Sequence, residues 1–107
     1  MLSPFSKKVI VLIKSIPAGK VCTYGRIATL AGNNHGARQV VRLLNSSSEK
    51  ENLPWHRIIN SKGTISLPEG DGYELQKSLL ENEGIEFDSN DKIDLTAFLW
   101  LPVKVKS

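Results

Sequence analysis

Apolar residues recur three and four residues apart in several parts of this chain, which is the spacing of one face of a helix. In the first such run, Ser3 supplies a helix cap and Pro4 occupies the first helical position, where its missing N–H costs nothing. The run ends at Pro17-Ala18-Gly19, so we expect a scaffold helix between Pro4 and this segment. Its apolar face consists of Phe5, Val9, Leu12, Ile13 and Ile16.

Two further helical patterns are joined by a short turn that contains glycine. Thr23 caps the first pattern, and Gly32 ends it. The second pattern runs from Ala37 to about Asn45. At about 100° per residue, its apolar and basic positions fall on opposite sides. The apolar side holds Ala37, Val40, Val41 and Leu44, and the other side holds Arg38, Arg42 and Asn45. This arrangement predicts a helix-turn-helix with a basic front.

Two β-prone runs follow, Arg57-Ile58-Ile59 and Thr64-Ile65-Ser66, on either side of Ser61-Lys62-Gly63. This order predicts a hairpin, which would be the wing of a winged helix. The expected fold is therefore mainly α with a small β-hairpin, a winged helix-turn-helix, and residues 1–107 are expected to form a single domain.

The C-terminal part contains one more helical pattern, from Tyr73 to Glu83, which closes at Gly84. We expect this helix to bury Leu75, Leu79 and Leu80. An acidic linker from Glu86 to Asp94 then leads to the apolar tail Phe98-Leu99-Trp100-Leu101, which we expect to dock on the core.

Charge is distributed unevenly along the chain. Residues 1–48 contain seven Lys or Arg residues and no Asp or Glu, whereas residues 68–107 contain nine acidic residues against four basic ones. A basic half favours a polyanionic partner such as nucleic acid, although basic faces also occur on proteins that bind none. No apolar run approaches the roughly 20 residues of a membrane span, and the single cysteine, Cys22, cannot form an internal disulfide. Cytoplasmic residence is the expectation.

Three patches of the chain resemble, in their order and spacing, the O6-alkylguanine-DNA alkyltransferases. They are Val21-Cys22-Thr23-Tyr24-Gly25-Arg26-Ile27-Ala28, Gly36-Ala37-Arg38-Gln39-Val40 and Pro54-Trp55-His56-Arg57. The resemblance runs from about Pro4 to Glu86, and it implies the winged helix-turn-helix of the C-terminal domain of those enzymes. In the enzymes a cysteine stands between the proline and the histidine-arginine pair, whereas this chain has Trp55. Pro-Trp-His-Arg is the pattern of the alkyltransferase-like proteins.

We expect DNA-binding roles for five residues, of which Tyr24 and Arg38 take theirs from the resemblance. Tyr24 would press on the DNA backbone and help to rotate the target nucleotide, and Arg38 would fill the gap left in the stack from the minor groove. Gly36 and Ala37 would let the helix approach the DNA closely, and Arg42 would contact a phosphate. Without the resemblance, Tyr24 is interpreted as a half-buried aromatic residue and the basic face as a solvated one.

The expected lesion pocket consists of Pro54, Trp55, His56, Arg57 and Glu83. His56 and Glu83 match positions that support a reactive thiolate in the enzymes. Trp55 cannot replace that thiolate, because the indole N–H only donates and its lone pair belongs to the aromatic system. Trp55 could instead stack on a flipped purine, adding about 1–3 kcal/mol by analogy with base–aromatic stacking. Considered alone, Trp55 and His56 would be a core aromatic and a satisfied buried histidine.

These features predict a non-catalytic DNA damage recognition protein. It would bind O6-alkylguanine in duplex DNA through the minor groove, flip the damaged nucleotide into a pocket and flag it for nucleotide excision repair. One alternative is a sequence-specific winged-helix DNA-binding regulator. Another is an enzyme that uses Cys22 as the alkyl acceptor, although one cysteine without a nearby activating base is weak evidence for a nucleophile.

The expected partners are double-stranded DNA containing O6-alkylguanine and nucleotide excision repair proteins of the UvrA class. We expect a monomer without membrane contact, associated with the bacterial nucleoid when bound to DNA. No cofactor or metal site is expected, because His35 and His56 have no ligand spacing and Cys22 has no partner cysteine.

Overall fold

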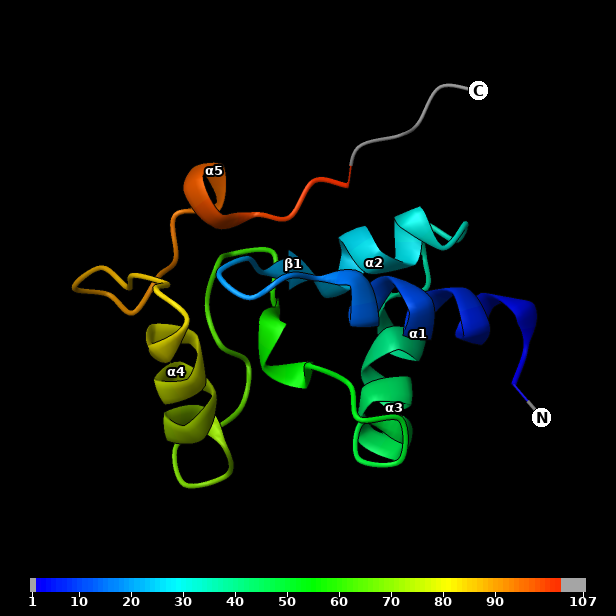
Figure 1. Ribbon diagram of the computed structural model, residues 1–107, viewed down its shortest axis with the longest axis horizontal. Helices are drawn as coiled ribbons and strands as arrows, with labels where there is room; N and C mark the ends of the chain where they lie inside the picture. Colours follow the sequence, from blue (N-terminus) through cyan, green and yellow to red (C-terminus); the bar gives the residue numbers. More distant parts are fainter. Residues whose placement is uncertain (1, 103–107) are drawn as a thin grey trace.

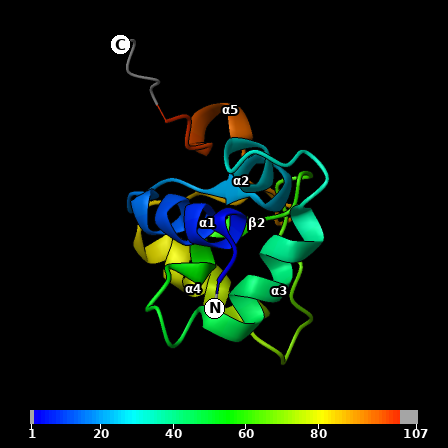
Figure 2. The same ribbon diagram turned by 90° about the vertical axis from the view of Figure 1, so that its right-hand side faces the viewer.

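The computed structural model describes residues 2–102 and is mainly helical, with one small two-stranded sheet (Figure 1). Its elements are α1 (Pro4–Ser15), β1 (Cys22–Thr23), α2 (Tyr24–Leu30), α3 (Ala37–Ser47), the 3-10 turn η1 (Trp55–Arg57), β2 (Ile58–Ile59), α4 (Tyr73–Asn82) and α5 (Leu95–Phe98). In Figure 2, α1 is seen nearly end-on, with α3 to its right. The predicted fold class is confirmed.

The first two helices begin where the sequence predicts. The Ser3 hydroxyl accepts the N–H of Ser6 at 3.1 Å, and Pro4 follows in the first turn of α1. The Thr23 hydroxyl accepts the N–H of Arg26 at 3.1 Å and caps α2 in the same way. Local capping chemistry therefore fixes where the helix-turn-helix begins.

The small sheet separates two hydrophobic clusters. β1 and β2 run parallel, with Cys22 opposite Ile58 and Thr23 opposite Ile59. Successive side chains of a strand point to opposite faces, so Cys22 and Ile58 enter the cluster formed with α1, α2 and α3. Ile59 enters the second cluster, which also contains Val21, Leu80, Ile85 and Ile93. The segment around η1 is thereby held from both sides.

The predicted hairpin is wrong. The partner of β2 is β1, and residues 64–66 form no strand. The side chain of Asn60 accounts for the difference, because its Oδ1 accepts the backbone N–H groups of Lys62 at 2.9 Å and Thr64 at 3.1 Å. The carbonyl of Gly63 accepts the N–H of Ile93 at 2.8 Å, so this part of the loop pairs with a distant segment. The wing is a tight turn closed by a side chain.

The C-terminal tail docks on the core, as predicted. The N–H of Val21 donates to the carbonyl of Phe98 at 2.9 Å, and the N–H of Trp100 donates to the carbonyl of Val21 at 2.7 Å. The acidic segment from Glu86 to Asp94 is more ordered than the predicted linker. It folds back through an antiparallel bridge between Phe87 and Ile93, and Ile93 is buried.

Two predicted core positions are wrong, one on α4 and one on α3. Leu75 is 55% exposed, and the buried residues of α4 are Gln76 and Leu80. On α3, Val41 is 38% exposed, and the buried residues are Val40, Leu43 and Ser47. Leu75 and Val41 line a cavity between the two helices instead of the core.

Candidate nucleic-acid interface

Helix α3 presents its basic residues to solvent. Val40 and Leu43 hold its inner side against α1 and α2, and this contact leaves Arg38 and Arg42 exposed. Neither arginine has an ion pair or side-chain hydrogen bond within residues 2–102. Both guanidinium groups are therefore available to an anionic partner such as a phosphate backbone.

A cavity of about 780 Å³, which we call the α3–α4 cavity, lies beside this basic face. Its walls come from α3 and its C-terminal end, from η1 and from the start of α4. Its apolar lining is formed by Val41, Leu44, Trp55, Ile58, Leu67 and Leu75, and its polar lining includes Tyr24, Asn45, Ser48 and Gln76. The volume falls in the range of small-ligand sites, and the mixture of apolar walls with a few polar groups is typical of them.

The structure brings Tyr24 and Trp55 to this one cavity from distant parts of the sequence. Trp55 stands in η1 directly before β2, and Tyr24 is the first residue of α2, directly after β1. Both side chains line the cavity, so the fold gives it two aromatic walls from separate elements. Burial raises the pKa of Tyr24 above its usual value, although the nearby Ser66 hydroxyl opposes that rise, so the phenol is neutral at pH 7.

The remaining residues of the predicted lesion pocket lie outside this cavity. His56, Arg57 and Glu83 form an ionic cluster, and neither they nor Pro54 line the cavity. The Nε2 of His56 lies 2.8 Å from Oε2 of Glu83, and the Arg57 Nη2 donates to the same oxygen at 2.7 Å. The edge-to-face contact between the rings of Trp55 and His56, with centroids 6.1 Å apart, joins the cluster to the aromatic wall.

The ionic cluster is closed by backbone groups as well. The Arg57 Nη1 donates to the carbonyl of Ile16 at 2.9 Å, at the end of α1. The N–H of Gly19 donates to Oε1 of Glu83 at 3.3 Å. Burial alone would raise the pKa of Glu83, but the hydrogen bonds from Arg57, His56 and Gly19 outweigh it and lower the pKa to about 2. Glu83 is therefore a carboxylate at any physiological pH.

Gln76 is the site residue that the sequence pattern missed. Its side chain is buried, and its Nε2 donates to the carbonyl of His56 at 3.0 Å and to that of Ile58 at 2.9 Å. These bonds fix the Trp55 segment to α4, and Gln76 also lines the cavity. The signal available in the sequence was that Gln76 directly follows Leu75, the leucine expected in the core. A rotation of the helix by one position turns Gln76 inward and Leu75 outward.

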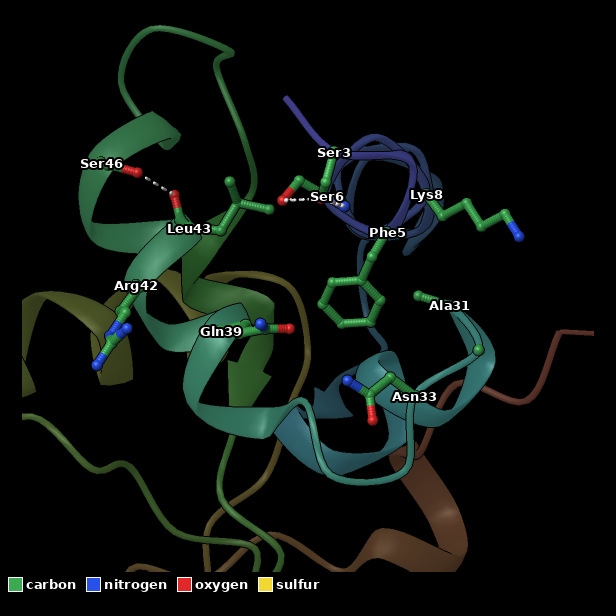
Figure 3. Close-up of a pocket in the computed structure, with 11 residues that line it drawn as sticks. Ser3, Phe5, Ser6, Lys8, Ala31, Asn33, Gln39, Arg42, Leu43 and Ser46 are labelled. Carbon is green, nitrogen blue, oxygen red and sulfur yellow. Dashed lines mark hydrogen bonds between the residues drawn. The ribbon is translucent and has the colours of Figure 1, made fainter. Parts of the chain in front are cut away.

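Gly36 has an internal reason to be glycine. It is buried, and a Cβ at this position would lie 2.7 Å from Cζ of Phe5. Figure 3 shows the Phe5 ring pointing from α1 toward Asn33 and Gln39. Close approach of Gly36 to DNA stays a prediction, as does that of Ala37, which is partly buried at the start of α3.

A second, polar groove of about 630 Å³ lies on the other flank of α3 (Figure 3). Arg42 lines this groove together with Gln39 and Ser46, whereas Val41, Leu44 and Asn45 line the α3–α4 cavity. Arg38 lines neither and lies on the outward face of α3, two turns before Asn45. The two arginines are thus placed differently, with Arg38 nearer in helical angle to the cavity flank.

Cys22 belongs to β1 and is fully buried. Burial raises the pKa of its thiol to about 11, so the reactive thiolate is scarce at pH 7. The side chain belongs to the first hydrophobic cluster. Its position does not favour alkyl transfer to Cys22.

Within residues 2–102, no group of three or more His, Cys, Asp or Glu side chains is arranged to hold a metal ion. No helix in the same part of the chain is long and apolar enough to cross a membrane.

Comparisons with known proteins cover almost the whole chain. Residues 4–85 match the family model described as 6-O-methylguanine DNA methyltransferase, DNA binding domain. The chain is 44% identical over 101 residues to the DNA base-flipping protein of Vibrio parahaemolyticus, which covers 94% of this chain and 100% of that protein. It is 39% identical over 106 residues to alkyltransferase-like protein 1 of Schizosaccharomyces pombe, with 94% of this chain and 98% of that protein covered.

The fold is similar to that of a protein solved on damaged DNA. The crystal structure of the Schizosaccharomyces pombe protein in complex with damaged DNA containing O6-carboxymethylguanine superimposes with a TM-score of 0.80. The two chains are 38% identical, and the match covers 95% of this chain and 99% of the other.

Proposed function

This chain belongs to the family of 6-O-methylguanine DNA methyltransferase DNA-binding domains, and on that premise we propose that it recognises O6-alkylguanine in duplex DNA by base flipping and does not repair it. Relatives named for base flipping and for likeness to alkyltransferases support this proposal. We further propose a single DNA-binding domain that acts as a monomer, because one copy of the chain carries the basic helix and the cavity together.

The observation that carries the proposal is the α3–α4 cavity beside the outward face of α3. A nucleotide rotated out of the base stack through the minor groove needs an apolar, partly aromatic receptor. It also needs a side chain that fills its place in the stack. Trp55 and Tyr24 supply the aromatic walls, and Arg38 is the exposed cation that could fill the gap. O6-alkylguanine pairs poorly, so its extrusion costs less than that of guanine, and this difference gives selectivity without catalysis.

Two features argue against alkyl transfer. Trp55 stands where the enzymes carry the acceptor cysteine, and an indole has no lone pair for nucleophilic attack. Cys22 is buried as a thiol. The ionic cluster of His56, Arg57 and Glu83 has no nucleophile to activate and is proposed to hold Trp55 in position.

Binding to two duplexes that differ only by one O6-methylguanine tests this function. We expect tighter binding to the lesion duplex, and intact-mass analysis after incubation should show no methyl gain on the protein and no loss from the DNA. A defined undamaged site bound more tightly than the lesion would favour a sequence-specific regulator. A gain of one methyl group on the protein would show that it is an enzyme.

We also propose that binding flags the lesion for nucleotide excision repair. A flipped nucleotide and a bent duplex form a larger distortion than one methyl group does. In Figure 1 the acidic turn formed by residues 86–94 lies away from α3, where it would remain accessible to a repair protein of the UvrA class. Reconstituted incision of a lesion duplex should increase when this protein is added at saturating concentration, and unchanged or blocked incision would contradict the handoff.

A further inference from the structure

Two carboxylates stand among the residues that line the α3–α4 cavity. Glu49 enters it from the end of α3, and Asp71 enters it from the loop before α4. They lie on two different walls, and both are exposed residues that reach the cavity surface. Among the residues that the structure describes, no Lys, Arg or His side chain lines this cavity.

Neither carboxylate is neutralised by a partner within residues 2–102, in contrast to acidic residues near them. Glu51 pairs with Lys14 at 3.4 Å, and Glu83 pairs with Arg57 behind Trp55. The side chains of Glu49 and Asp71 make no ion pair and no hydrogen bond in the described part of the chain. Among residues 2–102, the cavity lining therefore holds two carboxylates and no cationic side chain to balance them.

We propose that this lining makes the protein discriminate O6-alkyl groups by charge, favouring uncharged adducts over anionic ones. The inference rests on the proposed function, because it assumes that the flipped base enters the α3–α4 cavity. An O6-carboxymethyl group carries a carboxylate that is ionised at neutral pH, whereas methyl and other simple alkyl groups are neutral. Glu49 and Asp71 would repel the first and leave the second unaffected.

The size of the effect follows from separation and solvent. Two like charges several ångströms apart in a partly hydrated cavity repel by an energy that corresponds to about a five- to tenfold loss of affinity. The phosphate backbone is the same in two lesion duplexes of one sequence, so its contribution to binding cancels when they are compared. The Schizosaccharomyces pombe protein has been solved with O6-carboxymethylguanine DNA, so an anionic adduct is compatible with the fold. In this chain, Glu49 and Asp71 are the groups that would lower the affinity for such an adduct.

The test uses the full chain and two duplexes that differ by one group. One carries O6-carboxymethylguanine and the other carries O6-carbamoylmethylguanine, its neutral amide of nearly the same size. Dissociation constants should be about five- to tenfold weaker for the carboxylate than for the amide. In Asp71→Asn this ratio should fall about threefold, and in the Asp71→Asn/Glu49→Gln double variant it should approach one.

Glu69→Gln is the matched control. Glu69 lies two residues before Asp71, is exposed and does not line the cavity, so this variant removes the same charge from the same loop. It should leave the ratio at its wild-type value, although it shifts the affinity for both duplexes equally. Thermal unfolding followed by circular dichroism confirms that all variants are folded.

Each outcome decides the matter. Equal affinity of the wild type for the two adducts, both above undamaged DNA, would overturn charge discrimination and leave the proposed function intact. A preference for the amide that persists unchanged in the double variant, or that Glu69→Gln abolishes equally, would overturn the assignment to Glu49 and Asp71. If neither adduct, nor O6-methylguanine in the same duplex, binds more tightly than guanine, the proposed function fails and this inference fails with it.

Discussion

The two sides of Trp55 differ in whether their polar groups are hydrogen-bonded and their apolar side chains covered. Behind it, His56, Arg57 and Glu83 are closed by short ionic hydrogen bonds and by backbone groups at Ile16 and Gly19. In front of it, the α3–α4 cavity exposes apolar side chains such as those of Val41 and Leu75. A folded chain of this size normally covers large apolar side chains, so an open apolar wall beside a fully paired cluster indicates a receptor held by a rigid support.

We assign stability to the ionic cluster behind Trp55 and DNA binding to the α3–α4 cavity in front of it. Glu83→Gln should have the largest effect of the substitutions that test this assignment. The change leaves Arg57 partly buried without its counter-charge, and breaking such a pair costs about 3 kcal/mol or more. We expect a loss of about 3 kcal/mol in the free energy of unfolding, measured by denaturant titration. Glu81→Gln is the control, because Glu81 is exposed on α4, and it should change stability by less than about 0.5 kcal/mol. Equal losses in the two variants would remove the supporting role of the rear cluster.

Low pH should reduce the stability that the ionic cluster behind Trp55 contributes. The pKa of Glu83 is lowered to about 2 in the folded chain, from an ordinary value of 4.5 in the unfolded one. The unfolded chain therefore takes up the proton first as pH falls. The stabilisation by Glu83 is present in full above about pH 4.5 and is lost as pH falls toward 2. It amounts to about 3 kcal/mol as an order of magnitude, since 1.36 kcal/mol corresponds to one pKa unit.

Unfolding measured between pH 6 and pH 3 checks this dependence. The wild type should lose stability over the lower part of the range, and Glu83→Gln should lose distinctly less. Parallel curves for the two proteins would show that other carboxylates control the acid response.

Arginine substitutions on α3 test the DNA-binding side of Trp55. Arg38→Ala should lose about 2 kcal/mol for lesion DNA and less for undamaged DNA, because nothing then fills the gap in the stack. Arg42→Ala should weaken both duplexes alike and lower the salt dependence of binding by about one phosphate contact. Binding isotherms at several salt concentrations separate the two effects. Identical behaviour of the two variants would contradict a special position for Arg38.

Trp55→Ala should act mainly on DNA binding and have a smaller effect than the preceding substitutions. We expect a loss of about 1–2 kcal/mol in lesion affinity, the range of one base–aromatic stack, with Trp55→Phe retaining most of it. Competition binding with the lesion and undamaged duplexes measures the loss. If Trp55→Ala reduces the free energy of unfolding as much as Glu83→Gln does, Trp55 belongs to the support and not to the receptor.

Local chemistry made much of the fold predictable. The caps Ser3 and Thr23 and the basic outer face of α3 depend on neighbouring residues, and the structure has them where the sequence predicts. The β pairing was not predictable in this way, because β2 pairs with β1 from far away in the chain. Asn60 also favours a turn closed by its own side chain over the expected hairpin.

The candidate site was only partly predictable for a different reason. Helical periodicity assigns apolar residues to the core, and this rule fails where a protein keeps an apolar cavity open. Val41 and Leu75 were assigned to the core for that reason, and Gln76 was overlooked. The family resemblance assigned His56, Arg57 and Glu83 to the lesion pocket, and in the structure they contact one another outside the α3–α4 cavity. It did not reveal that Trp55 separates this group from the cavity.

The most direct measurement of base flipping uses a fluorescent cytosine analogue opposite the O6-methylguanine. Its emission rises when it loses its partner and its stacking. Saturating wild-type protein should raise the emission on the lesion duplex well above that on the undamaged duplex, and Tyr24→Ala, with its fold intact, should reduce the rise. Saturable binding to the lesion duplex with no change in emission would contradict base flipping by this protein.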